Sequence, residues 1–595
     1  MDKKNTIIGV ALLIVGMVLM TKTSQRQVEP NELPPQTAPE AIPSDQSGPA
    51  SPVDPSATPP VPSTITPVTN GHAKVEEITD REGEVIASLE NDFIEARFTN
   101  YGGSIKEIVL KKKKATIDGE DPYIMNRLRY VPALNLSTYL GDAKDVIFER
   151  VPSLTPNTVT FRAKLSDQLE ITRRYTISED AAYAAPYTIE HTLEFKNLSD
   201  QPLPLGEPSL NIGTVAPSGN QDRYLQTFGY YNGEDVEFTE QSDFSGGGFL
   251  FFKSEPMDFE QVNDTVVWAS VKNQFFITLL TPGEPGSGFI ARPVDFPLDP
   301  KTGEPATGIT ADVKMGAISL PAGGTVTKSF DFYAGPKEHT RLAKLKQGQE
   351  QAMQFGFFGA ISKILLQLMT WIHGFVGNWG VAIVLLTVVV RGTLLPITLM
   401  SMKSMRKMSK LQEPMKALKE KFPDDTQKQQ QMMMELYKLN KINPVAGCLP
   451  MLAQIPIFFA LFYMLRSAAE LRFADFLWIA DLSKPDTIGY VAGFPFNVLP
   501  FFWLVTLAYQ MWTMPTPTVD NAQTKMMKFM PFIFFPFTYT FSSGLVLYWS
   551  ISNLFTIGQQ WLTKRGQDDF EVQLPPAMKK AIEGDNSKKK KRKKN

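Results

Sequence analysis

The sequence predicts a membrane protein with an α-helical core of five spans, a further N-terminal anchor span and a large all-β domain. Three observations support this fold class. Long apolar runs lie near both ends of the chain, alternating apolar and polar residues fill its middle, and a proline-rich stretch follows the first apolar run. The chain has 595 residues, which at roughly 150 residues per domain corresponds to about four domain-sized units.

Composition excludes several classes of function. The net charge is −2, so the chain lacks the strong basicity typical of nucleic-acid-binding proteins. One cysteine, Cys448, cannot form an internal disulfide, and the four histidines are too far apart for local metal-ligand spacing. The sequence also lacks the motifs GxxxxGK[ST], HExxH and GxSxG. We therefore predict that the protein is not an enzyme and uses no cofactor or metal.

Residues 1–24 are predicted to form the anchor span, and residues 25–74 a periplasmic linker. Two lysines precede an uncharged apolar run from Thr6 to Met20, and no Ala-x-Ala cleavage pattern follows it. This favours an uncleaved anchor with a cytoplasmic N-terminus, with a cleaved export signal as the alternative. In the linker, 12 of the 46 residues from Gln25 to Asn70 are proline, which is typical of an extended tether.

Residues 75–345 are predicted to form a β-sandwich. Apolar and polar residues alternate from Leu169 to Ile177 and from Tyr187 to Lys196, which indicates strands with one buried face. Asn232–Gly233 between two further runs indicates a two-residue hairpin turn. His191 lies on the apolar face of its strand, so we interpret it as a packed core residue rather than a catalytic one.

Residues 350–376 are predicted to form an amphipathic helix in the membrane interface. From Phe357 to Phe375, large apolar residues share one helical face, whereas Lys363 and Gln367 lie on another. A helix packed on the sandwich is the alternative.

The second span is predicted at residues 377–400, and spans three to six within residues 448–563. The apolar runs are Val381–Leu399, Cys448–Leu465, Phe496–Met514 and Phe529–Leu562. As a single helix, the 34 residues of the last run would be about 51 Å long, against a hydrocarbon core of about 30 Å. We therefore predict two helices with a turn at Ser542-Ser543-Gly544.

Charge placement favours this number of spans. Residues 401–447, a predicted helical hairpin broken at Phe422-Pro423-Asp424-Asp425, hold nine lysines and one arginine against five acidic residues between Ser401 and Lys441. Residues 564–595, the tail, end in a run of seven basic residues before Asn595. With six spans both segments lie in the cytoplasm, as does the C-terminus, in agreement with the positive-inside rule.

Arg391 is the strongest candidate for a functional residue. It lies within the second span, and no Asp or Glu occurs between Glu350 and Glu413. An intramembrane guanidinium without an acidic partner requires water, backbone carbonyls or an incoming group, so we predict a hydrated cavity. An arginine that reaches the cytoplasmic headgroups is the alternative. Polar residues that can line the same cavity, or else join helices, are Thr387, Gln454, Ser550, Ser552 and Asn553.

The cytoplasmic segments contain two candidate recognition surfaces. Methionine-rich surfaces suit loose recognition of varied apolar segments, and a stripe that packs within the hairpin is the alternative. The hairpin methionines are Met402, Met405, Met408, Met415, Met432, Met433 and Met434. The basic tail suits contact with ribosomal RNA or anionic lipid, and a solvated tail that only reinforces topology is the alternative. Its residues are Lys588, Lys589, Lys590, Lys591, Arg592, Lys593 and Lys594.

Four motifs occur together in the C-terminal part of the chain. They are Val376-Gly377-Asn378-Trp379-Gly380 ahead of Arg391-Gly392, Asn443-Pro444-Val445-Ala446-Gly447-Cys448-Leu449-Pro450, Gln454-Ile455-Pro456-Ile457-Phe458, and Ser543-Gly544-Leu545-Val546-Leu547-Tyr548-Trp549 leading to Ser552-Asn553. Over residues 355–567, the sequence resembles the YidC family of bacterial membrane protein insertases. The anchor, linker and β domain match the Gram-negative form of this family in order and size.

The resemblance implies a periplasmic β-supersandwich and a five-span core whose groove opens to the cytoplasm and to lipid but is closed toward the periplasm. It implies that Arg391 is the groove arginine, with Thr387 one turn away and Tyr548 and Trp549 near passing substrate. Many members have a tyrosine where Trp549 stands, so only aromatic contact is carried over there. The implied function is insertion and folding of nascent proteins in the bacterial inner membrane, with the SecYEG translocon, the ribosome and the signal recognition pathway as partners.

The residues alone leave two other functions open. A secondary transporter or anion channel would use Arg391 as a substrate-binding charge, but such proteins usually contain internal repeats of spans, and this sequence shows none. A membrane-anchored periplasmic sugar-processing enzyme would leave the five apolar spans unexplained.

Overall fold

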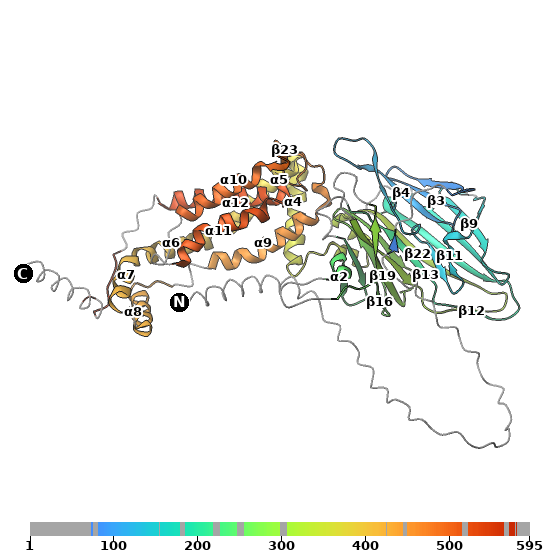
Figure 1. Cartoon of the computed structure of the whole chain (residues 1–595), viewed down its shortest axis with the longest axis horizontal. Coiled ribbons are helices and arrows are strands. Elements are labelled where there is room, and N and C mark those ends of the chain that lie inside the picture. Colours follow the sequence, from blue (N-terminus) through green and yellow to red (C-terminus); the bar gives the residue numbers. More distant parts are fainter. Residues whose placement is uncertain are drawn as a thin grey trace, which may run out of the picture. The chain divides into compact units, whose positions relative to one another are not determined.

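The computed structural model describes two compact units, one ending at Met353 and one beginning at Gln354. Figure 1 shows the first as strand-rich, in blue and green, and the second as helical, in yellow to red. The described residues are 73–74, 81–153, 155–178, 185–217, 226–246, 255–297, 306–423, 425–443, 449–513, 522–564, 571–576 and 579. The predicted anchor span, nearly all of the linker and the basic run of the tail lie outside them.

The larger sheet of the β unit has nine strands in the order β15-β14-β17-β18-β22-β11-β10-β9-β8, all paired antiparallel. Its strands are β8 (Glu149–Val151), β9 (Thr158–Lys164), β10 (Leu169–Ile177), β11 (Thr188–Asn197), β14 (Thr227–Tyr231), β15 (Val236–Glu240), β17 (Trp268–Lys272), β18 (Phe276–Pro282) and β22 (Thr325–Pro336). Residues alternate between buried and more exposed positions along β10 and β11, which confirms the predicted alternation.

A second sheet, in the order β1-β19-β20-β13-β6-β7 with β16 paired to β19, packs through β13 and β20 against β17. Its strands are β1 (Ala73–Lys74), β6 (Leu136–Thr138), β7 (Gly141–Asp142), β13 (Ser209–Thr214), β16 (Glu260–Val262), β19 (Gly288–Phe296) and β20 (Ala306–Lys314). The two sheets form the predicted sandwich. Only β1, which runs parallel to β19, departs from antiparallel pairing among the described strands.

A four-stranded sheet and a two-stranded ribbon complete the β structure of this unit. Their strands are β2 (Ile86–Glu90), β3 (Ile94–Thr99), β4 (Ser104–Lys114) and β5 (Pro122–Met125), and β12 (Leu203–Gly206) with β21 (Ile318–Leu320). Short helices are η1 (Ala143–Asp145), η2 (Ala185–Tyr187), α2 (Gln241–Ser245), α3 (His339–Leu342) and η4 (Gln349–Met353).

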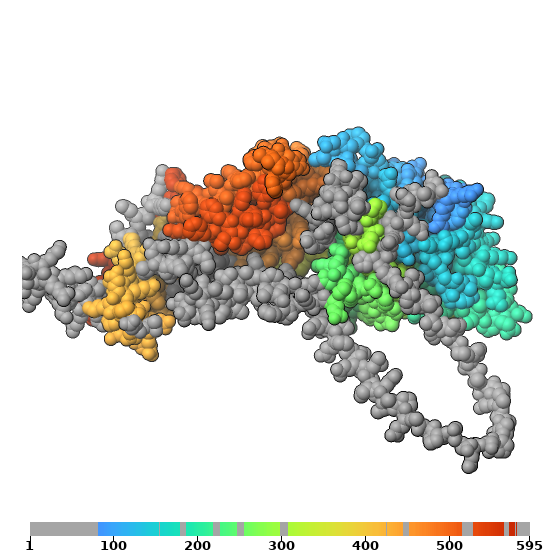
Figure 2. Space-filling view, in the orientation of Figure 1, coloured from blue at the N-terminus to red at the C-terminus, as the bar shows by residue number. Residues whose placement is uncertain are grey.

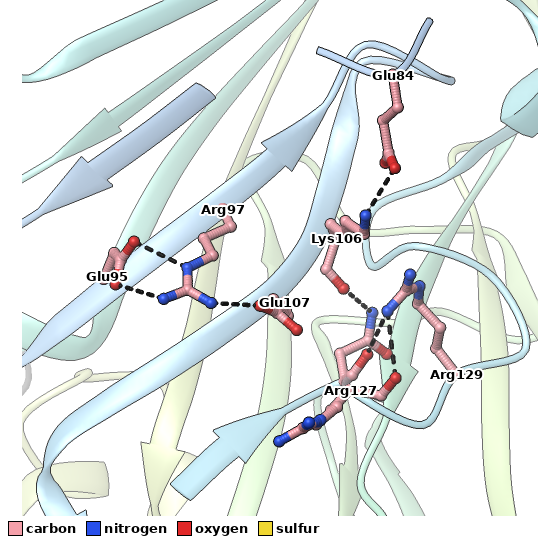
Figure 3. Close-up of polar contacts among 8 residues, drawn as sticks. Glu84, Glu95, Arg97, Lys106, Glu107, Arg127 and Arg129 are labelled. Carbon is pink, nitrogen blue, oxygen red and sulfur yellow. Dashed lines mark hydrogen bonds and ion pairs between the residues drawn. The ribbon is translucent and has the colours of Figure 1, made fainter. Parts of the chain in front are cut away.

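Ion pairs join residues of the four-stranded sheet and its approach (Figure 3). Arg97 contacts Glu95 on its own strand at 2.8 Å and Glu107 on β4 at 2.6 Å, and Lys106 contacts Glu84 at 2.6 Å. The Lys106–Glu84 pair is mostly shielded from solvent. Because the Arg97 pairs are partly exposed, each contributes about 0–1 kcal/mol to stability.

The predicted turn at Asn232–Gly233 is wrong in its length. Tyr231 pairs with Val236, so the loop between β14 and β15 has four residues, 232–235. The side-chain oxygen of Asn232 accepts hydrogen bonds from the backbone N–H groups of Glu234 and Asp235, both at 2.9 Å. This local bonding of an asparagine side chain stabilises the wider turn.

The helical unit contains most of the predicted apolar runs as separate helices. They are α4 (Gly359–Val376), α5 (Trp379–Thr393), α6 (Leu395–Lys410), α7 (Gln412–Lys421), α8 (Thr426–Leu439), α9 (Leu449–Ser467), α10 (Val498–Thr513), α11 (Ala522–Thr538) and α12 (Ser543–Lys564). Between α9 and α10 lie η6 (Ala469–Leu471) and the hairpin β23 (Thr487–Val491) and β24 (Phe494–Asn497). The interval between α11 and α12 confirms the predicted break of the last run.

The predicted second span at residues 377–400 is not one straight helix. It breaks at Leu394, and α5 and α6 meet at a bend of 60°. Pro396 stands in the first turn of α6, where it has no N–H for the carbonyl of Gly392 and its ring crowds that carbonyl. Arg391 therefore lies in the last turn of α5 rather than deep within a longer span.

Among the described residues, α4 alone is long and apolar enough to cross a membrane, and the bent α5–α6 pair would be a second such element. The apolar parts of α9 and α10 are shorter. The number of six spans therefore stays a prediction. One side of α4, including Leu365, Met369 and Ile372, is buried, and α4 packs against α5 and α9. Its position in the membrane interface also stays a prediction.

Candidate functional site

Three predicted polar residues lie on α5, α9 and α12, and α12 packs against the other two helices. The side-chain amide of Gln454 on α9 donates a hydrogen bond to the hydroxyl oxygen of Tyr548 on α12 at 3.1 Å. Arg391 on α5 lies within electrostatic range of Tyr548, and α12 packs against both α5 and α9. The structure thus brings together residues that are up to 157 positions apart in the sequence.

The guanidinium group of Arg391 is incompletely bonded. Its Nε is buried, and no described residue accepts a hydrogen bond from it. The last turn of a helix presents unpaired carbonyls with partial negative charge. This negative charge compensates part of the positive charge of Arg391. A carboxylate that approached Arg391 would supply the rest of the compensation, so the site favours an incoming anionic or polar group.

Trp549 forms an aromatic cluster next to this polar site. Its ring stacks on Phe458 of α9 with centroids 5.5 Å apart, and Phe541 and Trp503 lie at 5.6 and 6.2 Å. Successive residues on a helix differ by about 100° in direction, so Trp549 faces another side of α12 than Tyr548. The α9–α12 junction therefore has an apolar side formed by this cluster and a polar side formed by Gln454 and Tyr548.

The hydroxyl groups of Thr387 and Ser550 are satisfied within their own helices. Thr387 donates to the carbonyl of Ile383 at 2.7 Å, and Ser550 donates to the carbonyl of Val546 at 2.8 Å. Both residues are fully buried. Neither hydroxyl therefore needs a hydrated cavity. Ser552 is also buried, one turn from Tyr548 on the same face of α12.

A polar ladder between α10 and α12 was missed by sequence reasoning. Asn553, a predicted cavity residue, donates to the hydroxyl of Thr506 at 3.2 Å, and Thr513 donates to the side-chain oxygen of Gln560 at 2.9 Å. Each helix advances by seven residues, or two turns, between these bonds. The spacing of Thr506, Gln510 and Thr513 within one apolar run could have revealed this stripe.

The segment between α9 and α10 closes the end of the helical unit that lies opposite the charged hairpin. At the start of α12, the N–H groups of Ser543 and Gly544 donate to the carbonyls of Lys484 and Leu482 at 2.7 and 2.9 Å. Asp486 accepts from the backbone N–H of Leu499 at the start of α10 at 2.7 Å. These bonds satisfy helix N-termini that would otherwise be unpaired.

The charged hairpin places only part of its methionines on the surface. Met408, Met415 and Met432 form a buried cluster with Leu411, Leu418, Leu436, Tyr437 and Ile442, and Met405 is also buried. Met434 is 55% exposed, and Met402 and Met433 are half-buried. The stripe thus packs largely within the hairpin, and Met434 is the hairpin methionine with the most exposed side chain among the seven.

The C-terminal segment at residues 571–575 folds back onto this hairpin. The side chain of Asn440 donates to the carbonyl of Gln573 at 2.8 Å and accepts from its N–H at 2.9 Å. Val572 and Leu574 pack against the methionine cluster. We call this contact the tail clasp. It lies between α12 and the predicted basic run of the tail.

Comparison with known proteins identifies the family. The model of the YidC periplasmic domain matches residues 87–368, and that of the 60Kd inner membrane protein matches residues 371–569. A membrane protein insertase YidC from Tolumonas auensis is 31% identical over 505 residues, which cover 81% of this chain and 87% of that protein. The chain belongs to the YidC family. It is therefore a bacterial inner membrane protein with a β-rich periplasmic domain and a helical C-terminal region.

Further YidC proteins show a similar extent of likeness. The membrane protein insertase YidC of Azotobacter vinelandii is 30% identical over 600 residues, which cover 95% of this chain and 98% of that protein. A solved structure of an active YidC insertase with its first transmembrane domain resolved covers 84% of this chain and 95% of its own, at 19% identity and a TM-score of 0.35.

Proposed function

We propose that this YidC family member inserts nascent membrane proteins into the bacterial inner membrane and assists their folding, through a hydrated groove that contains Arg391. One observation carries the groove: the buried Nε of Arg391 on α5 has no acceptor among the described residues, and α12, which bears the hydrogen-bonded Tyr548, packs against both α5 and α9. The insertase names of relatives matched over most of their length support the activity.

The mechanism follows from the cost of moving polar groups into lipid. A charged side chain at the centre of a membrane helix costs about 2.5–3.5 kcal/mol, whereas each central Leu, Ile, Phe or Val contributes roughly −0.3 to −0.6 kcal/mol. A nascent apolar segment therefore enters lipid favourably, but its polar tail meets a barrier. Arg391 attracts acidic or polar parts of that tail, and water in the groove shortens the distance over which they are desolvated.

The other predicted parts serve this reaction in the same proposal. The half-exposed Met402 and Met433 and the exposed Met434 receive the nascent apolar segment, and Trp549 with Tyr548 contacts it on the way to lipid. The basic tail binds the ribosome or anionic lipid. Both termini are cytoplasmic, and the SecYEG translocon and the signal recognition pathway deliver or share substrates.

Insertion into proteoliposomes tests the role of Arg391. We expect Arg391→Ala to slow insertion of a single-span substrate with an acidic tail by about tenfold, because loss of roughly 1.4 kcal/mol of stabilisation changes a rate tenfold. Arg391→Lys keeps the charge and should retain most of the rate. Lys403→Ala, an exposed residue of the hairpin, is the matched control. Protease protection of the substrate tail is the measurement.

A second substrate separates attraction from general damage. With the acidic residues of its tail replaced by Ser, the substrate should lose most of its dependence on Arg391. Equal insertion of the acidic substrate by Arg391→Ala and by the unaltered protein would contradict the role of Arg391. Equal slowing of both substrates would show that Arg391 stabilises the helix junction and does not attract the acidic tail of the substrate.

A further inference from the structure

The hairpin of β23 and β24 is an exposed apolar element without charge. Its residues from Thr487 to Asn497 include no Asp, Glu, Lys or Arg. Tyr490 is 75% exposed and Phe494 77% exposed, and Ile488 and Val491 are 55% and 65% exposed. Figure 2 shows this part of the chain, in orange, as a rounded projection of the helical unit.

Apolar side chains stand on both faces of the hairpin. Tyr490 lies on one face, and Val491 and its pair partner Phe494 lie on the other. A strand of a soluble protein usually has one polar face for water. A two-stranded ribbon is also marginally stable by itself in water, and an uncharged apolar projection marks a site of interaction.

The hairpin is held firmly at its base. Asn497 donates from its side chain to the carbonyl of Tyr539 at 2.8 Å, and the hydroxyl of Tyr539 accepts from the N–H of Asn497 at 3.3 Å. The ring of Phe496 lies 5.7 Å from that of Phe501 in α10. These contacts tie the hairpin to the adjacent ends of α10 and α11, so its position relative to those helices is fixed.

The exposed surface continues from the hairpin onto the two helices. Phe502 and Val505 of α10 are 42% and 66% exposed, and Phe537 of α11 is 63% exposed. Under the proposed topology these side chains face lipid. The hairpin lies at the outer end of both helices, because it connects α9 to α10 at the end opposite the charged hairpin. Its apolar surface is thus continuous with the lipid-facing surface.

We propose that the hairpin of β23 and β24 is a lipid anchor that lies in the outer interface of the bilayer. The inference rests on the proposed topology of the spans. Tyrosine is enriched in this zone, and Tyr490 is exposed on the hairpin. Each strand has one edge without a partner strand among the described residues, and unpaired backbone groups are not tolerated in the hydrocarbon core. The hairpin therefore lies among headgroups and upper acyl chains, and it fixes the depth of α10.

The test uses an environment-sensitive dye on single cysteines of the full chain in proteoliposomes. Cys448 is replaced by Ser, and the dye is attached to Phe494→Cys, to Val505→Cys on α10, or to Asp200→Cys on an exposed turn of the β unit. We expect a blue shift and quenching by nitroxides near the headgroups at position 494. Position 505 should be quenched more by nitroxides deep in the acyl chains, and position 200 only by aqueous iodide.

The outcomes distinguish failure of the anchor from failure of the topology. If nitroxides in the lipid quench the dye at position 505 but only iodide quenches it at position 494, the proposed lipid anchor is wrong and the topology stands. If nitroxides in the lipid quench the dye at neither position, the proposed topology is wrong, and the anchor that rests on it is wrong as well. Protection at position 494 that disappears when the protein is diluted in lipid would indicate a second copy as the occupant and would overturn the proposal. Insertion by each variant in the same vesicles checks that the labelled protein works.

Discussion

His191 is buried in the β unit among Tyr175, Arg173 and the backbone of Arg174. Its ring stacks on Tyr175 with centroids 4.3 Å apart, its Nε2 lies 3.4 Å from the guanidinium of Arg173, and its Nδ1 lies 3.2 Å from the carbonyl of Arg174. Burial, followed by the positive charge of Arg173, holds the pKa of His191 well below its ordinary value. The ring is therefore neutral, and Nδ1 donates to the carbonyl.

We expect His191 to make the β unit less stable in mild acid. The unfolded chain binds a proton near pH 6.5, whereas the folded chain does so only at lower pH, so the free energy of unfolding falls as the pH drops below about 7. Thermal unfolding of the full chain at pH 7.5 and pH 5.5 measures the effect. His191→Gln should unfold with a smaller difference between the two pH values. An unchanged difference would show that other groups cause the pH dependence.

Asp486 is a second buried group whose partners define an experiment. Its Oδ2 accepts hydrogen bonds from the indole N–H of Trp478 at 3.1 Å and from the backbone N–H of Leu499 at 2.7 Å. We expect Asp486→Ala to lower the free energy of unfolding by about 1–3 kcal/mol, because the N–H of buried Leu499 is left without an acceptor. Asp486→Asn keeps an acceptor oxygen and should cost much less. The melting temperature in detergent at pH 7 is the measurement.

The charge of Asp486 has its own pH dependence. Burial raises the pKa of this carboxyl despite its hydrogen bonds. Between the ordinary and the raised value the folded chain binds more protons, so stability falls as the pH rises through that window. Asp486→Asn should lack this slope. If Asp486→Asn lowers the free energy of unfolding at pH 7 as much as Asp486→Ala does, hydrogen bonding by residue 486 does not stabilise the start of α10.

For single residues, the sequence predicts which face of a strand is buried better than it predicts which side chains a residue contacts. The alternation around His191 was enough to place it on a buried face, because the period of a strand is local information. Its contacts with Arg173 and Tyr175 depend on the pairing of β10 with β11. The role of Asp486 depends on a bond to a helix that begins 12 residues later, which no local pattern in the sequence indicates.

Helix boundaries are predicted correctly where the length of an apolar run or a helix-breaking sequence determines them. The run from Phe529 to Leu562 was too long for one span, so a break near Ser543 followed from membrane thickness. Asp425 caps α8 by accepting from the N–H of Lys428 at 2.9 Å, as the Pro-Asp-Asp sequence indicated. The bend at Leu394 was missed because Pro396 lies inside an uninterrupted apolar run, where hydropathy masks a helix breaker.

The tail clasp gives a prediction about the hairpin and the segment that follows α12. Asn440→Ala removes both bonds to Gln573, while Val572 and Leu574 keep their apolar contacts. We expect residues 571–576 to be cleaved faster by an added protease, with little change in the melting temperature. Gln573→Ala keeps the backbone bonds and is the matched control. Equal cleavage of the Asn440→Ala variant and the unaltered protein would mean that apolar packing alone holds the clasp.

At the scale of the whole molecule, the motifs point to candidate residues but do not predict how these residues are arranged. Gln454 and Tyr548, both candidates from the sequence, are joined by a hydrogen bond, yet Thr387 and Ser550 bond within their own helices. The strand order of the nine-stranded sheet, in which β11 lies between β10 and β22, depends on contacts across more than 100 residues. Hydrophobic patterns carry no information about such pairing.

The last part of the β unit is fastened to its sheet before the chain enters the helical unit. The ammonium group of Lys272 on β17 donates to the carbonyl of Ala352 at 2.7 Å, and the indole N–H of Trp268 donates to the carbonyl of Gln347 at 3.1 Å. Lys272 is buried, and burial lowers its pKa well below the ordinary value. Burial of this amino group is tolerated because the carbonyl of Ala352 accepts its hydrogen bond.

We therefore expect Lys272→Met to release residues 347–353 from the sheet while the sheet itself stays folded. Methionine fills a similar volume without the amino group that bonds Ala352, and loss of roughly 1.4 kcal/mol of local stability accelerates amide exchange about tenfold. Hydrogen exchange of peptides from β17 and from residues 347–353 measures both parts separately. Lys112→Met, an exposed residue of β4, is the control. Unchanged exchange at 347–353 would show that the bond from Trp268 and the packing of Met353 suffice to hold the chain where it leaves the β unit.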